Sequence, residues 1–203
     1  MIRKLLKKNE YKEELSAKYN KMKNELIVLT RLKDFTIILH NSEEGLANKA
    51  INKIWMPKKV SKYNENQLRF IMSHEMAHIE FKETTTTIEH IFLKAKENRL
   101  KNIINEVMAD IRGFRISGID LDDIDSYFKI VNNNQTANDL YKFGYFLPDV
   151  RNSFVIYSTK SEFTKEGFRR KFICEYNRIS NAKSLNEKEL DRLLYYYFDE
   201  FGI

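Results

Sequence analysis

Apolar side chains recur at a helical spacing along the first part of the chain. Four large ones lie three or four positions apart: Leu15, Tyr19, Met22 and Leu26. This period places them on one face of an α-helix, with mostly polar residues between them. We therefore expect an amphipathic helix over residues 4–24.

The pattern then changes to short runs that are typical of strands. Residues 26–30 and 35–39 are rich in β-branched and large apolar side chains, and they predict two neighbouring strands, arranged as a hairpin. Residues 41–45 are predicted to form a loop. Residues 52–56 predict a third, short strand. Pro57 at its end favours the edge of the sheet, because proline cannot donate a hydrogen bond to a neighbouring strand.

From residue 64 onwards the helical period returns. Asn64 and Gln67 have the spacing of a capping box, and the apolar residues after them predict a helix to about Lys82. A run of threonines interrupts the pattern, and a long helical stretch, of one helix or two, then runs to about Ile116 before Gly118 closes it. Further helices are predicted at residues 120–132, 137–146, 162–177 and 186–201.

The composition fits one α+β domain. Of the 203 residues, 42% are hydrophobic and 32% are charged, so the chain can bury a core and is not a disordered one. Six glycines and two prolines are few for a turn-rich β-sandwich, which favours helices. We expect one domain over residues 1–203. Its parts are a basic helix (1–24), a small twisted sheet of about three strands with the helices of the site (25–116), and a mainly helical remainder (117–203).

Some classes of protein are excluded by features that the sequence lacks. Its apolar runs, such as residues 35–39, are far shorter than the roughly 18 residues that a membrane span needs. The first eight residues are charged and do not have the apolar stretch of a signal peptide. Cys174 is the single cysteine, so there is no internal disulfide and no zinc knuckle built on cysteines. We therefore expect a cytoplasmic protein with no membrane partner.

The positive charge of the chain is concentrated at one end. The formal net charge is +6, and residues 1–24 hold eight Lys or Arg against three Glu. A solvated, lysine-rich helix face explains this excess, and no known nucleic-acid-binding signature accompanies it. Nucleic acid is therefore not an expected partner. A regulator that binds DNA through this helix is an alternative, which salt-dependent DNA binding would reveal.

The motif that carries chemistry lies in the helix predicted after Asn64. Residues 74–78 read H-E-M-A-H, and two of the four histidines of the chain are in this motif. Positions i and i+4 of a helix lie on one face, so His74 and His78 can bind one Zn²⁺ together. Glu75 projects beside that face, where a carboxylate can accept a proton from a water activated by the metal.

A catalytic zinc site also needs a third protein ligand and an open position. Residues 105–110 read N-E-V-M-A-D, and Glu106 and Asp110 share one face of a second predicted helix. If the two helices cross, Glu106 can reach the metal, and Asp110 can accept a hydrogen bond from a ligand histidine and fix its tautomer. Glu106 is the preferred third ligand; the alternatives are Asp110, Glu80, Glu89 and His90.

H-E-x-x-H followed by N-E-x-x-A-D resembles the gluzincin arrangement of the thermolysin-like and related zinc metallopeptidases. The resemblance covers about residues 35–116. In size and layout the chain is also similar to soluble metallopeptidases of phages and mobile elements. The resemblance implies a zincin-like fold and one Zn²⁺ per chain, bound by His74, His78 and Glu106. It also implies that Glu75 is the general base and that Asp110 supports His74.

The resemblance leaves one catalytic role without a residue. Thermolysin-like enzymes stabilise the oxyanion with a histidine well downstream of the motif, and no histidine follows His90 in this chain. A tyrosine or an arginine must therefore take that role. The candidates are Tyr141, Tyr145, Arg151 and Tyr157.

The leading interpretation is a zinc-dependent endopeptidase that hydrolyses a peptide bond of a protein substrate, with Glu75 as general base. The predicted strand at 52–56 would hold an extended peptide by strand addition. The alternative is a zincin-like binding or regulatory module that keeps its zinc but does not turn over. The missing downstream histidine favours this module, whereas the intact Glu75 favours the enzyme. Both interpretations expect a protein or peptide partner.

Overall fold

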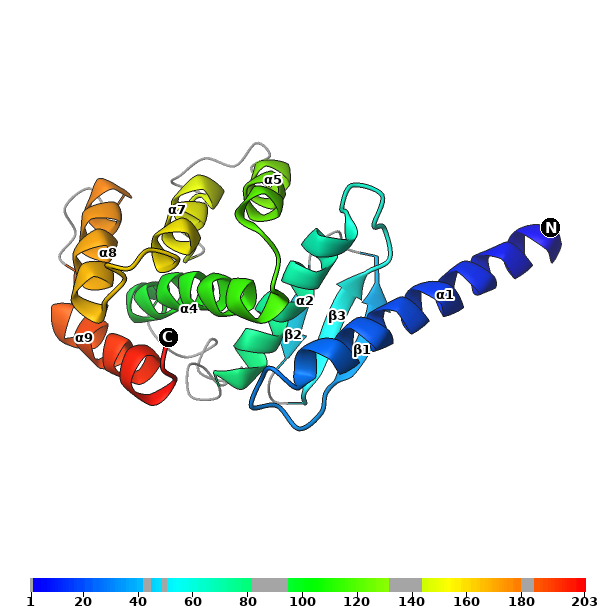
Figure 1. The fold of residues 1–203 in the computed structure, drawn as a ribbon, viewed down its shortest axis with the longest axis horizontal. Helices are drawn as coiled ribbons and strands as arrows, with labels where there is room; N and C mark the ends of the chain where they lie inside the picture. Colours follow the sequence, from blue (N-terminus) through cyan, green and yellow to red (C-terminus); the bar gives the residue numbers. More distant parts are fainter. Residues whose placement is uncertain (1, 42–44, 49–50, 82–94, 132–143, 180–184) are drawn as a thin grey trace. The chain divides into compact units, whose positions relative to one another are not determined.

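A computed structural model describes residues 2–41, 45–48, 51–81, 95–131, 144–179 and 185–203 of the chain (Figure 1). The described chain combines helices with a small mixed sheet, so the predicted α+β class is confirmed. Its contacts divide it into two compact units. The first unit comprises Met1–Glu83 and Gly113–Ile119, and the second comprises Thr84–Arg112 and Asp120–Ile203.

The sheet of the first unit has three strands in the order β1-β3-β2. β1 (Thr36–His40) runs parallel to the central strand β3 (Lys53–Pro57), and β2 (Leu46–Asn48) runs antiparallel to it. The predicted strands at 35–39 and 52–56 are confirmed. The edge position predicted for the second of them is wrong, because β3 pairs on both sides.

Pro57 is compatible with the central position of β3 because it is the last residue of that strand. It is paired with His40, and the hydrogen bond that follows comes from Lys58, whose backbone N–H donates to the His40 carbonyl over 2.9 Å. β2 was not predicted from the sequence. It is three residues long and lies directly after the segment predicted as a loop.

Helix α1 (Ile2–Ile27) is longer than predicted, and this corrects the strand expected at 26–30. Leu26 continues the buried face that begins at Leu15, and it is completely buried. The two residues after the helix, Val28 and Leu29, form a turn with 77% and 52% of their surface exposed. The helical period therefore outweighs the local β propensity of these residues.

Helix α2 (Glu65–Glu80) begins as the sequence predicts. The Asn64 side chain accepts a hydrogen bond from the Gln67 backbone N–H over 2.8 Å, and the Gln67 side chain accepts one from the Asn64 backbone N–H over 2.9 Å. The helix packs on β2 and β3, and α1 packs on α2 and β1 (Figure 1). α2 ends at Phe81, whose N–H still donates to the Ala77 carbonyl.

Helix α4 (Ala95–Ser117) ends just before Gly118, as the sequence predicts. The part of the predicted helical stretch before residue 95 lies outside the described residues. Gly118 has φ +64°, a left-handed conformation that glycine adopts without strain. Residues 95–112 belong to the second unit and the last turns to the first. A Cβ at Gly113 would lie 2.8 Å from the His74 backbone nitrogen, so glycine is required where α4 passes α2.

The second unit is helical. Its further described helices are α5 (Leu121–Val131), α7 (Pro148–Ser158), α8 (Lys165–Ile179) and α9 (Glu187–Tyr195), which continues as a π-helical turn, η1 (Tyr196–Glu200). Their core is a cluster of buried aromatic rings: Phe146, Phe154, Phe168 and Phe172. The sequence predicts α5, α8 and α9 but misses α7. The helix predicted at 137–146 is wrong at residues 144–146, which are not helical; residues 137–143 lie outside the described ranges.

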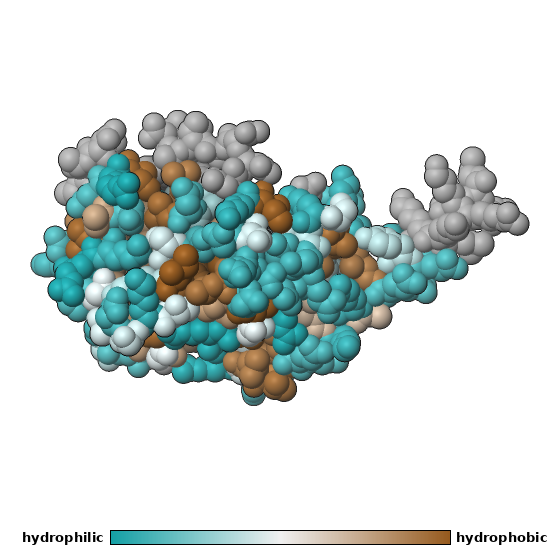
Figure 2. Space-filling model, turned by 45° about the horizontal axis from the view of Figure 1, so that its top comes forward, coloured by the Kyte–Doolittle hydropathy of each residue, from teal (hydrophilic) through white to brown (hydrophobic). Residues whose placement is uncertain are grey.

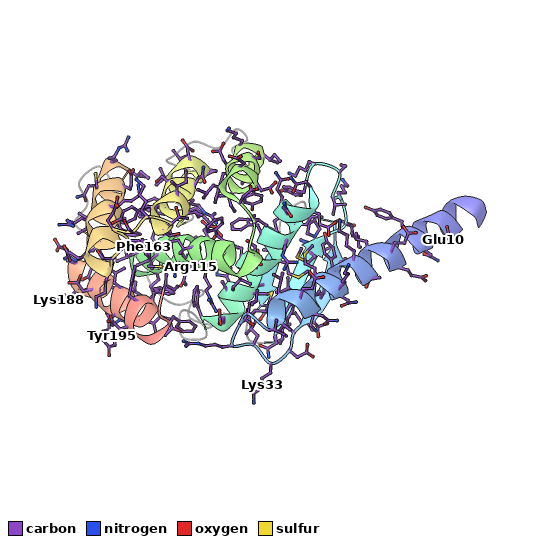
Figure 3. The ribbon with its side chains drawn as sticks, in the orientation of Figure 1. Glu10, Lys33, Arg115, Phe163, Lys188 and Tyr195 are labelled. Atoms are coloured by element: carbon purple, nitrogen blue, oxygen red, sulfur yellow. The ribbon has the colours of Figure 1, made fainter. Side chains whose placement is uncertain are left out.

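The face of the molecule drawn in Figure 2 is mostly polar. Figure 2 shows hydrophilic side chains over much of the visible face, with smaller hydrophobic areas among them. Charged side chains such as Lys33 and Lys188 point away from the ribbon (Figure 3). Among the described helices, none is long and apolar enough to cross a membrane.

Candidate metal centre

Helix α2 places the two motif histidines together, as the sequence predicts. The Nε2 atoms of His74 and His78 are 3.0 Å apart, and their ring centroids lie 4.6 Å apart with the ring planes at 88°. At this separation two nitrogen lone pairs would repel each other. Either one ring donates an N–H to the other, or both nitrogens direct their lone pairs at one cation. The second arrangement is that of two histidines bound to a metal ion.

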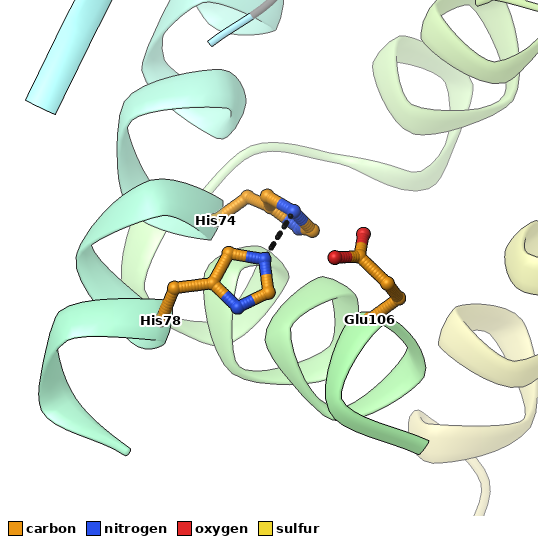
Figure 4. A group of neighbouring side chains, drawn as sticks. All are labelled: His74, His78 and Glu106. Carbon is orange, nitrogen blue, oxygen red and sulfur yellow. Dashed lines mark hydrogen bonds between the residues drawn. The ribbon is translucent and has the colours of Figure 1, made fainter. Parts of the chain in front are cut away.

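The carboxylate of Glu106 completes a group that can hold a metal. One ligand atom from each of His74, His78 and Glu106 lies within 4.8 Å of the others, and the Glu106 carboxylate points at the two rings (Figure 4). Two metal–ligand bonds of about 2.0–2.1 Å span at most about 4.2 Å. Small side-chain rotations would therefore close the group on one ion. Two imidazole nitrogens and one carboxylate oxygen are a donor set of catalytic zinc sites.

The position of Glu106 follows from helix geometry. Gly113 lies against the backbone of His74, and Glu106 is seven residues earlier in the same helix. Seven residues make nearly two turns, so Glu106 is on the same face of α4 as Gly113, about 10 Å along the axis. Asp110 lies between them on that face. The sequence spacing alone thus selects Glu106 and Asp110.

Asp110 is completely buried, and an arginine binds both of its carboxylate oxygens. Arg151 of α7 donates from Nε to Oδ2 over 2.6 Å and from Nη2 to Oδ1 over 2.8 Å. The same Nη2 lies 3.2 Å from Oε2 of Glu106. Burial alone would lower the pKa of Arg151, but the charges of Asp110 and Glu106 outweigh it and raise that pKa, so the guanidinium stays charged. That Asp110 also supports His74 stays a prediction.

Glu75, the predicted general base, is buried under the chain that leads into β2. Only 7% of its surface is exposed. A Cβ at Gly45 would lie 2.8 Å from Oε1 of Glu75 and 2.8 Å from Cγ2 of Ile71. A larger residue at position 45 would therefore displace the side chain of Glu75 or Ile71, or the chain before β2. The sequence places Gly45 in a loop and gives no sign of this contact.

Among the alternative ligands, Glu80 has a different role. Glu80 is buried at the end of α2, where its Oε1 accepts a hydrogen bond from the Arg31 backbone N–H over 2.7 Å. This bond fixes the turn after α1 and gives Glu80 a structural role. Glu89 and His90 lie outside the described residues.

The four candidates for the oxyanion role differ in their surroundings. Tyr141 lies outside the described residues. Tyr145 is 36% exposed. The Tyr157 hydroxyl donates to the Glu162 carbonyl over 3.2 Å, which ties the end of α7 to the turn before α8. Arg151 is directed at two carboxylates, a role that the sequence did not predict.

Comparison with protein-family models, curated proteins and solved structures found no match for this chain. The H-E-x-x-H motif and the geometry of its side chains are therefore the evidence for its function.

Proposed function

We propose that this protein is a zinc-dependent endopeptidase with a single metal centre. The observation that carries the proposal is the convergence of His74, His78 and Glu106, whose ligand atoms lie within 4.8 Å of one another. The sequence motif supports it, because a general base follows the first histidine directly. A structural zinc site has four protein ligands and needs no such base.

The chain would bind the ion through the two Nε2 atoms and one carboxylate oxygen, which leaves a position for water or substrate. When bound, Zn²⁺ supplies Lewis-acid chemistry: it lowers the pKa of water and polarises a carbonyl group. The ligand set fits this chemistry, since two neutral imidazoles and one carboxylate leave the ion a net positive charge.

Glu75 would move the proton. It is adjacent in sequence to His74, and its side chain is largely shielded from bulk solvent. In the proposed reaction it would accept one proton from the attacking water, whose oxygen bonds to the carbonyl carbon. It would then deliver that proton to the leaving amine nitrogen as the peptide C–N bond breaks, so that a carboxylic acid and an amine are released and Glu75 regains its charge. The close approach of Gly45 would hold the carboxylate in one orientation.

An extended peptide substrate would bind along β2. The strand predicted for this purpose, at 52–56, is the central strand β3, and both of its sides are paired. β2 has one neighbour among the described strands, so its other edge offers backbone groups for strand addition. Gly45, directly before β2, touches Glu75. A peptide paired with β2 would therefore pass close to the general base.

One observation favours the alternative, a zinc-bound binding module without turnover. Glu75 is 7% exposed, and a general base must reach a water molecule that approaches the metal. The absence of a histidine after His90 also favours the binding module.

The test that separates the two compares the wild type with Glu75→Gln on a peptide library. Glutamine keeps the shape of the side chain but cannot accept the proton. If the protein is an endopeptidase, Glu75→Gln should retain its zinc, and its rate of peptide cleavage should fall by at least ~10²-fold. Glu65→Gln, an exposed position at the start of the same helix, is the matched control and should cleave normally. A binding module would cleave nothing as wild type and would bind its partner equally well with glutamine at position 75.

A further inference from the structure

Arg151 connects two carboxylates that lie one turn apart on α4. It comes from α7, 41 residues after Asp110 in sequence. Its side chain is 15% exposed, that of Glu106 is 16% exposed, and that of Asp110 is not exposed at all. All three residues belong to the second unit. Solvent therefore screens these charges only weakly.

The guanidinium of Arg151 contacts both carboxylates. Nε and Nη2 bind both oxygens of Asp110, and Nη2 also approaches Oε2 of Glu106 at 3.2 Å. The guanidinium also lies over the Phe128 ring, with Cζ 5.8 Å from the ring centroid. These contacts fix the plane of the guanidinium against α4. An oxyanion stabiliser would instead direct these N–H groups at the reacting carbonyl.

Glu106 has two sets of neighbours. Its Oε2 lies 3.2 Å from Nη2 of Arg151, and one ligand atom of its carboxylate lies within 4.8 Å of the ligand atoms of His74 and His78. A contact that fixes the carboxylate on one side therefore also affects how it faces the histidines.

We propose that Arg151 is a positioning residue of the metal centre. It anchors Asp110, holds Glu106 by one carboxylate oxygen, and thereby orients the other towards His74 and His78. This inference rests on the proposed metal centre, because Arg151 can affect the metal only if Glu106 is one of its ligands. In this role Arg151 is not the oxyanion stabiliser that the sequence offered as a possibility. Helix α7, which the sequence does not predict, then contributes a residue to the site.

The experiment is a double-mutant cycle on the zinc affinity of the full-length protein, measured by competition with a chromophoric chelator. The variants are Arg151→Gln, Glu106→Gln and the double variant. We expect Arg151→Gln to weaken zinc binding about 10–100-fold, as is typical when a group that orients a ligand is lost. In the Glu106→Gln background the same change should have no further effect.

Arg169 provides a matched control. It lies in α8 and also bridges two carboxylates, with Nε 2.7 Å from Asp191 and Nη2 2.6 Å from Glu187, but these partners are exposed and both belong to α9. Arg169→Gln should leave the zinc affinity unchanged. Arg151→Lys is the second variant, because it keeps the buried charge if glutamine prevents folding. Lysine cannot bridge both acids, so the zinc affinity of Arg151→Lys should lie between those of the wild type and Arg151→Gln.

The outcomes separate the two proposals. If Glu106→Gln weakens zinc binding but neither Arg151 variant does, the positioning role is wrong and the metal centre stands. If Arg151→Gln weakens binding equally in both backgrounds, it does not act through Glu106, and the positioning role is also wrong. If the wild type binds no zinc, the proposed function itself fails.

Discussion

Gly113 of α4 lies directly against the backbone of His74. A Cβ at position 113 would be 2.8 Å from the His74 nitrogen and 2.9 Å from its Cα, distances that real Cβ atoms essentially never show. The neighbouring atoms are backbone and cannot rotate away. The absence of a side chain at this position thus sets how closely the last turns of α4 approach the H-E-x-x-H helix.

Gly113→Ala should therefore disturb the metal centre without removing a ligand. Alanine normally stabilises a helix by about 0.5–1 kcal/mol relative to glycine. Here we expect the opposite, a loss of about 1–3 kcal/mol in the free energy of unfolding from overpacking, together with weaker zinc binding. Chemical denaturation and chelator competition measure the two effects. Gly118→Asn is the control, since a Cβ there meets open space and asparagine tolerates its positive φ. A more stable Gly113→Ala protein with normal zinc affinity would refute the close packing.

Gly45→Ala should impair the general base while leaving the zinc in place. The added Cβ would lie 2.8 Å from Oε1 of Glu75, so the carboxylate or the chain before β2 must move. A shift of about 1 Å in a catalytic group can reduce turnover by about 10²-fold. We expect peptide cleavage to fall by at least ~10-fold with unchanged zinc content, measured on the same preparation. Normal cleavage by this variant would show that the orientation of Glu75 is not critical.

Asp110→Asn should reduce both stability and zinc affinity. Asparagine removes one of the two charged partners of the largely buried Arg151, the one that binds it through two hydrogen bonds, and breaking a buried ion pair typically costs about 3–5 kcal/mol. Zinc affinity should fall about 10–100-fold, less than with Glu106→Ala, which removes a ligand and should abolish most of the binding. Equal affinities of Glu106→Ala and the wild type would show that the third ligand lies elsewhere in the chain.

Leu26 and Val28 should respond very differently to truncation. Leu26 is completely buried on the inner face of α1, whereas Val28 is 77% exposed in the turn after it. Leu26→Ala should lower the free energy of unfolding by about 2–5 kcal/mol, and Val28→Ala should change it by less than about 0.5 kcal/mol. Denaturant unfolding measures both. Similar losses for the two variants would instead support a strand at 26–30.

Features determined by local contacts were predicted from the sequence. The capping box at Asn64, the helical stripe of α1 and the pairing of His74 with His78 each depend on residues at most a few turns apart. The strand at 26–30 was predicted wrongly because its β-branched residues were weighed without the helical period that reaches Leu26. One signal for α7 was present, since proline at the first helical position is common, and Pro148 occupies it.

Features determined by long-range contacts could not be predicted in the same way. The central position of β3 depends on β2, whose three residues carry no strand pattern. The pairing of Arg151 with Asp110 joins residues 41 positions apart, and nothing in either segment specifies it. The contact of Gly45 with Glu75 depends on the path of the backbone. The sequence therefore identifies the ligands, whereas the residues that position them emerge only from the fold.

The most direct test of the central claim is the zinc content of freshly purified, unchelated protein by elemental analysis. The account predicts about one Zn²⁺ per chain, lost in His74→Ala and in His78→Ala. His40→Ala, which removes a histidine from the end of β1, should retain the metal. Wild-type protein without metal, or zinc that persists in both motif variants, would contradict the account.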